Sequence, residues 1–197
     1  MGRKSKAEVR KKEILENFYI ILKEEGFENA SIAKIANRME VNPSLLIHYF
    51  KTKEEMVVAF VEKLLKQHKK NFKEKVSTAD SPKNKLNQVL NILFSEEWLN
   101  FSDPTVFYAC YYLSSRNERV RKRFKDMYAS FREILIPQAR SWMEAQIIRE
   151  QSPEAVADYI IIMNEGLLYY DKLMSDPEGF SRRARYLKEA VMKTLTC

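Results

Sequence analysis

The chain has 197 residues, 45% of them hydrophobic and 31% charged, with a net charge of +7 and only four glycines. This length and balance suit one or two domains with an apolar core, and no apolar run reaches the ~18 residues of a membrane span. Average proteins contain about 7% glycine, and sandwiches, barrels and glycine-rich nucleotide loops need many turns. The scarcity of glycine therefore argues against those classes and favours an all-α fold.

Positive charge gathers in the first third of the chain. Residues 1–76 hold 17 Lys and Arg against 11 Asp and Glu, whereas residues 77–197 hold 17 against 16. One interpretation is an anionic partner for the N-terminal part, nucleic acid before membrane, and the other is a solvated basic surface. No apolar stretch follows the basic N-terminus, and the two cysteines, Cys110 and Cys197, fit a reduced, cytoplasmic protein.

Prolines predict where five helices begin. Five of the six prolines follow Asn, Ser or Asp, which are good N-cap residues, so helices are expected to start near 43, 82, 104, 153 and 177. Pro137 falls inside the helical stretch 118–150 and is expected to kink or break it. Apolar periodicity adds a first helix ending at Gly26, a short helix capped by Ser31, and a helix over 53–75. The total is nine or ten helices and no strand.

Residues 31–50 carry the pattern of a helix-turn-helix. They read as a short helix, a tight turn through residues 39–41 and a second helix from Pro43. Ala36 is small where the two helices would cross, and Val41 is apolar where the turn would face the core. Two short helices at a steep angle leave the second free to enter a major groove.

A set of short motifs over residues 10–57 makes this interpretation more specific. The chain has Gly26-Phe27 after an apolar helix, then Ser31, Ile35-Ala36, Val41-Asn42, the aromatic-rich His48-Tyr49-Phe50 and Lys53-Glu54. In this order they resemble the N-terminal domain of the tetracycline-repressor (TetR) family. The resemblance implies a helix-turn-helix DNA-binding domain over 1–53 and a larger helical effector-binding and dimerisation domain over 54–197, with about nine helices. It also implies a ligand-responsive regulator, most often a repressor, that binds a palindromic operator as a homodimer.

Two positions depart from the family pattern. Glu40 occupies the turn position that usually holds glycine, where a left-handed backbone would cost roughly 1 kcal/mol for another residue. Ile47 replaces a tyrosine that contacts a phosphate in the family, so His48 or Tyr49 is expected to supply that contact. These departures sustain an alternative, a helical protein–protein interaction or dimerisation module without specific DNA binding.

The expected DNA-binding residues lie on the helix-turn-helix, on the basic N-terminal arm and at the start of the next helix. The first turns of the two short helices offer a positive dipole end to phosphate, and exposed positions of the second helix can reach base edges. Lysines are expected to position the protein rather than to read sequence. The full set is Arg3, Lys4, Ser31, Lys34, Asn42, Pro43, Ser44, Leu45, His48, Tyr49, Lys51 and Lys53.

Aromatic residues crowd positions 94–142, which permits two interpretations. Most can form an ordinary core, while the family resemblance implies a pocket for a small organic effector. The expected pocket residues are Phe94, Glu97, Trp98, Tyr108, Tyr111, Tyr128, Phe131 and Asn164, with Glu97 and Asn164 as polar anchors. A cationic ligand over these aromatics is one possibility, and a ligandless dimerisation module is another.

The last two helices are apolar over more than one face, which predicts a second packing partner. The family's dimer packs these helices against their mates in a four-helix bundle. The expected dimer residues are Tyr159, Met163, Gly166, Leu167, Tyr170, Leu187 and Val191.

Catalysis finds little support in the sequence. There are two histidines, His48 in the second short helix and His68, which is expected on a solvated helix face among lysines. No His, Cys, Asp or Glu cluster has metal-ligand spacing, and no nucleophile elbow or phosphate loop occurs. We therefore expect no enzyme activity, no metal and no cofactor.

Overall fold

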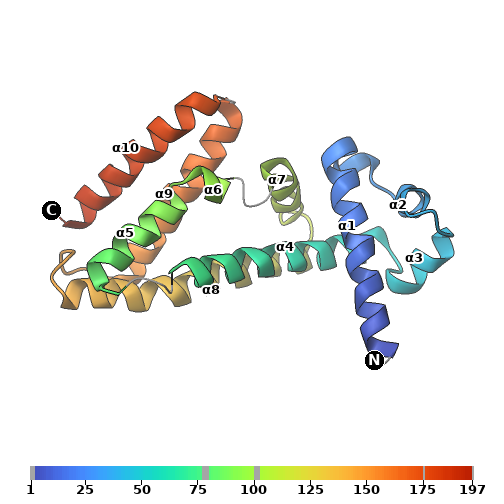
Figure 1. The fold of residues 1–197 in the computed structure, drawn as a ribbon, viewed down its shortest axis with the longest axis horizontal. Helices are drawn as coiled ribbons and strands as arrows, with labels where there is room; N and C mark the ends of the chain where they lie inside the picture. Colours follow the sequence, from blue (N-terminus) through green and yellow to red (C-terminus); the bar gives the residue numbers. More distant parts are fainter. Residues whose placement is uncertain (1–2, 77–79, 100–102, 175, 197) are drawn as a thin grey trace. The chain divides into compact units, whose positions relative to one another are not determined.

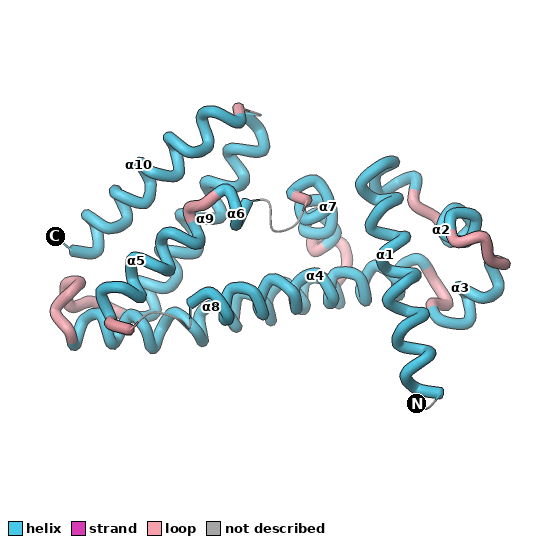
Figure 2. Tube along the Cα trace, viewed as in Figure 1, coloured by secondary structure: helices cyan, strands magenta, loops and turns pink. Residues whose placement is uncertain are grey.

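A computed structural model describes the backbone of residues 3–76, 80–99, 103–174 and 176–196, and their side chains except for residues 3–5, 99 and 177. Within these ranges the chain forms ten helices joined by short loops, with no strand (Figures 1 and 2). They are α1 (Arg3–Asn29), α2 (Ile32–Arg38), α3 (Pro43–Tyr49), α4 (Lys53–Val76), α5 (Pro82–Leu93), α6 (Glu96–Leu99), α7 (Pro104–Leu113), α8 (Glu118–Glu144), α9 (Pro153–Met174) and α10 (Pro177–Thr196). The all-α prediction is confirmed.

The five helix starts predicted from proline are also confirmed, because each preceding residue caps its helix as expected. Asn42 and Ser81 accept hydrogen bonds from the backbone N–H groups of Ser44 and Asn84. Asp103 does the same for α7, Ser152 for α9 and Asp176 for α10. Side-chain oxygens thus satisfy N–H groups that have no partner within the helix.

Two predicted helix breaks turn out differently. Gly26 interrupts α1 with φ 79° and ψ 172°, a conformation almost restricted to glycine, but one further helical turn follows it through Asn29. Pro137 lies inside α8, which runs unbroken from Glu118 to Glu144, so of the expected kink or break the break does not occur. The ring of Pro137 is exposed, so water can reach the helix where proline removes a hydrogen bond.

The chain folds into two compact units, each made of two separate stretches of sequence. The first unit contains residues Met1–Lys66 and Ser102–Phe124, and the second contains Gln67–Phe101 and Lys125–Cys197. The helices α4 and α8 therefore pass from one unit into the other. The division differs from the boundary after residue 53 that the family resemblance implies, since α7 packs on α1 in the first unit.

Polar contacts help to hold α7 and the start of α8 in the first unit. Asn117 donates a hydrogen bond to Glu54 at 2.6 Å, and Arg123 pairs with Glu62 at 3.0 Å. The ring of Phe124 packs edge-on against Phe107 and Tyr111. In the second unit α9 packs against α10 and α5 against α6. None of the described helices is long and apolar enough to cross a membrane.

Candidate functional site

The helix-turn-helix of the first unit is fixed by buried apolar side chains and by a tight turn. Ile35, Ala36 and Leu46 are buried, and α2 contacts both α1 and α3. In the turn, the N–H of Val41 donates to the carbonyl of Ala36 at 3.0 Å. Glu40 has φ 53°, so the turn adopts the left-handed conformation at the position where the family usually has glycine.

The residues predicted to read DNA lie together on the outer face of α3. Asn42, Pro43, Ser44 and His48 are exposed, while Leu45 and Tyr49 are partly exposed. Ile47 is 49% exposed, which is unusual for an isoleucine without a partner. The N–H of Ser44 is occupied by the cap of Asn42 at 2.9 Å, so the hydroxyl of Ser44 is better placed than its backbone to meet a phosphate. At α2, Ser31 caps the N–H of Lys34 at 3.2 Å.

Two cations of α2 already have acidic partners on α1. Lys34 pairs with Glu25, and Arg38 pairs with Glu24 at 2.9 Å. These pairs are largely exposed, so each contributes little to stability, but they reduce the positive charge that α2 offers to DNA.

The two lysines beside α4 have different surroundings. The Lys53 ammonium donates to the carbonyl of Phe27 at 2.9 Å and lies 4.7 Å from the centre of the Phe27 ring. Lys53 therefore ties α4 to the end of α1. Lys51 is exposed, and its side chain has no partner among the described residues. The side chains of Arg3 and Lys4 lie outside the described residues.

A buried hydrogen-bond chain crosses the interior of the second unit. Asn164 donates to the carbonyl of Leu93 at 2.5 Å and accepts from the indole N–H of Trp98 at 3.2 Å. The rings of Phe72 and Phe131 pack edge-on with Trp98 and with one another. A single amide thus joins α9 to the end of α5 and to α6.

His68 belongs to this interior, which corrects the prediction of a solvated position. It is 7% exposed, and its ring meets Trp98 edge-on at 5.8 Å. Burial lowers the pKa of His68 to about 4, so the ring is neutral at pH 7. The neighbouring lysines misled the prediction, because they cover one face of α4 while His68 lies on the other.

Glu165 is a partly exposed acidic residue next to Asn164 that the sequence analysis did not single out. Burial of its carboxyl group raises its pKa to about 7, and a hydrogen bond with Tyr128 opposes that shift. No Lys or Arg pairs with it in the described part of the chain. The position of Glu165 next to Asn164 in α9 could have suggested it as a site residue. The desolvation of its carboxyl group, however, depends on helices that are distant in the sequence.

The predicted pocket residues do not form one group. Trp98, Phe131 and Asn164 are buried in the second unit, Tyr128 reaches Glu165, and Phe94 is buried at the end of α5. Tyr108 and Tyr111 belong to the first unit, where Tyr111 is half-exposed. Glu97 is exposed and pairs with Lys75, so it is not an anchor of this interior.

The predicted dimer residues also divide. Leu167 and Val191 are buried within the unit, so they support α9 and α10 from inside. Tyr170 and Gly166 are exposed, and Tyr159, Met163 and Leu187 are partly exposed. Large apolar side chains that the sequence analysis did not select are more exposed: Ile162, Tyr169, Leu173 and Met174 of α9 and Tyr186 of α10.

Two further chemistries find no support in the described residues. Among them no group of three His, Cys, Asp or Glu residues could hold a metal ion. Burial raises the pKa of Cys110 to about 12, so its thiol is not a nucleophile at neutral pH.

Comparison with known proteins agrees with this geometry. The family described as "Bacterial regulatory proteins, tetR family" matches residues 19–60, and "Tetracyclin repressor-like, C-terminal domain" matches residues 81–197. The HTH-type transcriptional regulator BetI of Rhizobium meliloti is 22% identical over 169 residues, which cover 86% of this chain and 81% of that protein.

Solved structures share the fold over almost the whole chain. A TetR transcription regulator from Haloarcula marismortui has a TM-score of 0.84 at 19% identity, covering 95% of this chain and 98% of its own. A transcriptional regulator from Saccharomonospora viridis in complex with choline has a TM-score of 0.76 at 16% identity, with 93% and 94% covered. FadR from Bacillus subtilis in complex with stearoyl-CoA has 0.73 at 16%, with 91% and 96% covered. With a helix-turn-helix at one end and a matching C-terminal domain over more than half of its length, this chain belongs to the TetR family of transcriptional regulators.

Proposed function

We propose that this regulator represses transcription by binding a palindromic operator as a homodimer through α3, and that a small organic cation in the second unit modulates this binding. The observation that carries the DNA-binding part is the outer face of α3. Asn42, Ser44 and His48 project from a helix that Leu46 and Phe50 anchor in the core. Amide, hydroxyl and imidazole groups on an anchored helix can read base edges in a major groove.

The exposed apolar residues of α9 and α10 support a homodimer. Ile162 is 66% exposed, Leu173 65% and Tyr186 70%. Apolar side chains at such density on two adjacent helices favour an interface with a second copy, and a two-fold dimer matches the two half-sites of an operator. Tyr170 and Gly166 remain candidates for that interface. Leu167 and Val191 are buried within the unit and support the two helices from the core side.

The interior of the second unit favours a cationic effector. Glu165 has no cationic partner in the described residues and is hydrogen-bonded to Tyr128. The Tyr128 ring packs edge-on against Phe131, which in turn packs against Trp98. A carboxylate beside aromatic faces suits an organic cation and repels an anion. The choline bound to the regulator from Saccharomonospora viridis is of this class, whereas the stearoyl-CoA bound to FadR is not.

The DNA-binding proposal is tested by selecting sequences from random double-stranded DNA with the purified protein. We expect the recovered sequences to share an inverted repeat. His48→Ala should relax the preference at one position in each half-site, because a lost base contact weakens discrimination there. Recovery of sequences without any consensus would reject operator binding and favour the interaction module.

The effector proposal is tested by following Trp fluorescence during titration with choline and with 3,3-dimethylbutan-1-ol, its neutral isostere. We expect saturable binding of choline only, weakened roughly tenfold in Glu165→Gln, which corresponds to about 1.4 kcal/mol. Binding should strengthen as pH rises through about 7, since the carboxyl group then becomes ionised. Equal responses to both compounds, or an unchanged affinity in Glu165→Gln, would reject a cation site at Glu165.

A further inference from the structure

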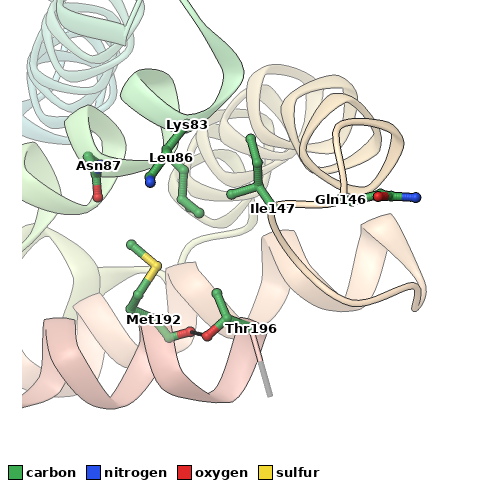
Figure 3. Close-up of a pocket in the computed structure, with 7 residues that line it drawn as sticks. All are labelled: Lys83, Leu86, Asn87, Gln146, Ile147, Met192 and Thr196. Atoms are coloured by element: carbon green, nitrogen blue, oxygen red, sulfur yellow. Dashed lines mark hydrogen bonds between the residues drawn. The ribbon is translucent and has the colours of Figure 1, made fainter.

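The second unit contains a cavity that the proposed function does not use. It is half open, with a volume of about 360 Å³, and its lining comes from α5, the turn after α8 and α10 (Figure 3). Three apolar side chains line it: Leu86 from α5, Ile147 from the turn and Met192 from α10. A volume of this order lies near the lower end of the range for small-molecule sites.

Among the residues that line this cavity, Lys83 carries a charge and the other polar residues are neutral. Lys83 and Asn87 lie one turn apart on α5 (Figure 3). Lys83 is exposed, and its ammonium has no acidic partner among the described residues. Thr196 donates its hydroxyl proton to the carbonyl of Met192 at 3.0 Å, so its oxygen adds no charge. The lining therefore offers an apolar floor with a single cation and an amide at its edge.

The turn that forms one wall is firmly held. The N–H of Gln146 donates to the carbonyl of Met143 at 2.8 Å, and that of Ile147 donates to Trp142 at 2.9 Å, which is the pattern of a Schellman motif. The N–H of Arg149 donates to the carbonyl of Leu195 at 2.9 Å and so joins the turn to α10. These bonds preform the cavity wall, so a ligand need not order it.

One residue of this wall is strained. Gln146 has φ 55° at the position where a Schellman motif usually has glycine, and it lines the cavity. This conformation is unfavourable for a residue other than glycine, because its Cβ atom crowds the backbone. The side chain of Gln146 extends away from the other lining residues (Figure 3), so its amide does not face the cavity. Backbone outliers of this kind gather at binding sites.

We propose that this cavity binds a small amphipathic carboxylate. Its alkyl or aryl group packs on Leu86, Ile147 and Met192, and its carboxylate meets the Lys83 ammonium, with a hydrogen bond from the amide of Asn87. The charge preference is opposite to that of the Glu165 interior. This site depends on neither DNA binding nor the cation site, so each can fail without the other.

The test uses octanoate as the probe, with octylamine and octan-1-ol as matched cationic and neutral compounds, followed by saturation-transfer NMR and calorimetry on the full chain. We expect saturable binding of octanoate in preference to the other two. Lys83→Ala should weaken it roughly fivefold, since an exposed ion pair contributes about 1 kcal/mol. Lys85→Ala, which changes a lysine on the same helix outside the cavity lining, is the control and should change the affinity less than twofold.

A second variant separates the cavity from general surface charge. Ile147→Trp fills the cavity and should abolish octanoate binding, while its circular dichroism and urea unfolding, compared with the wild type, show that the unit remains folded. The proposal is overturned if octylamine binds as well as octanoate. It is overturned equally if Lys83→Ala matches Lys85→Ala, or if Ile147→Trp still binds octanoate.

Discussion

The helix-turn-helix and the interior of the second unit present their functional groups in opposite ways. Around α3 the polar side chains are exposed, and the bonds that position them join residues two to five apart, such as Asn42 to Ser44 and Val41 to Ala36. In the second unit the polar groups are buried, and Asn164 joins Leu93 and Trp98 across 71 and 66 residues. A DNA-binding surface can thus be formed by residues close together in the sequence, whereas the interior of the second unit needs helices that are far apart in the sequence.

This difference has energetic consequences. Exposed groups on α3 can be exchanged at small cost in stability, because water replaces the lost contacts. Buried polar groups leave unpaired partners when they are removed. Mutations in α3 should therefore change DNA binding with little loss of stability, and mutations of the buried amide should destabilise the fold.

The largest expected effect is on Asn164. Asn164→Leu removes the buried amide that bonds the carbonyl of Leu93 and the indole N–H of Trp98. Unfolding by urea should show a loss of about 3 kcal/mol, since each buried unpaired group costs roughly 1–3 kcal/mol. Asn91→Leu is the control, because Asn91 is exposed and, within the described part of the chain, its side chain bonds only Lys188. A loss below about 1 kcal/mol in Asn164→Leu would show that the hydrogen bonds of the Asn164 amide contribute little to the stability of the second unit.

The next effect is on the pH dependence of stability. Glu165 has a folded pKa of about 7, above its unfolded value of 4.5, so this group destabilises the fold as pH rises between those values. His68 has a folded pKa of about 4, below its unfolded value of 6.5, so it stabilises the fold as pH rises over that window. The two trends oppose one another over most of this range.

Glu165→Gln removes one of these trends and exposes the other. Its free energy of unfolding should rise by roughly 3 kcal/mol between pH 4 and 6.5, where the wild-type profile stays flatter, and should exceed the wild-type value above pH 7. Thermal unfolding across this range checks the prediction, with the exposed Glu133→Gln as control. If the free energy of unfolding varies with pH in the same way in wild type and Glu165→Gln, the carboxyl group of Glu165 is exposed to solvent and its pKa is not raised.

A smaller effect separates the two lysines beside α4. Lys51→Ala should reduce the slope of log affinity against log salt by about 1, because a free lysine at this surface neutralises one phosphate. Lys53→Ala should lower stability by about 1 kcal/mol, because its ammonium caps the carbonyl of Phe27. Salt titrations of DNA binding and urea unfolding of both variants check this contrast. Equal stability of the two variants would show that the hydrogen bond from Lys53 to Phe27 does not stabilise the end of α1.

The smallest effect is on the turn before α3. Glu40→Gly relieves the left-handed backbone and should stabilise the protein by up to about 1 kcal/mol, with some of the gain lost to the freer unfolded chain. DNA binding should stay the same, because the turn already has the required conformation. Differential scanning calorimetry with an exposed Glu28→Gly as control gives the result, and destabilisation would show that Glu40 makes a contact worth more than the strain.

The contrast between the regions also explains what the sequence could predict. Helix starts at Pro43, Pro82 and Pro104 follow from a cap and a proline, which are features of adjacent residues. The burial of His68 could not be inferred, because its lysine neighbours describe only the solvent side of α4 and Trp98 lies thirty residues away. For the same reason the aromatic count suggested one pocket, although Tyr108 and Trp98 belong to different units.

The most direct test of operator binding is the salt dependence of binding to the DNA upstream of this protein's own gene, in the presence of unlabelled random competitor. We predict binding that resists competitor, falls steeply with salt and gives a footprint with two-fold symmetry, as expected for two copies of α3 on two half-sites. The inverted repeat recovered by random selection provides the positive control. Binding to both DNAs that competitor abolishes would contradict the account and leave the helix-turn-helix as an interaction module.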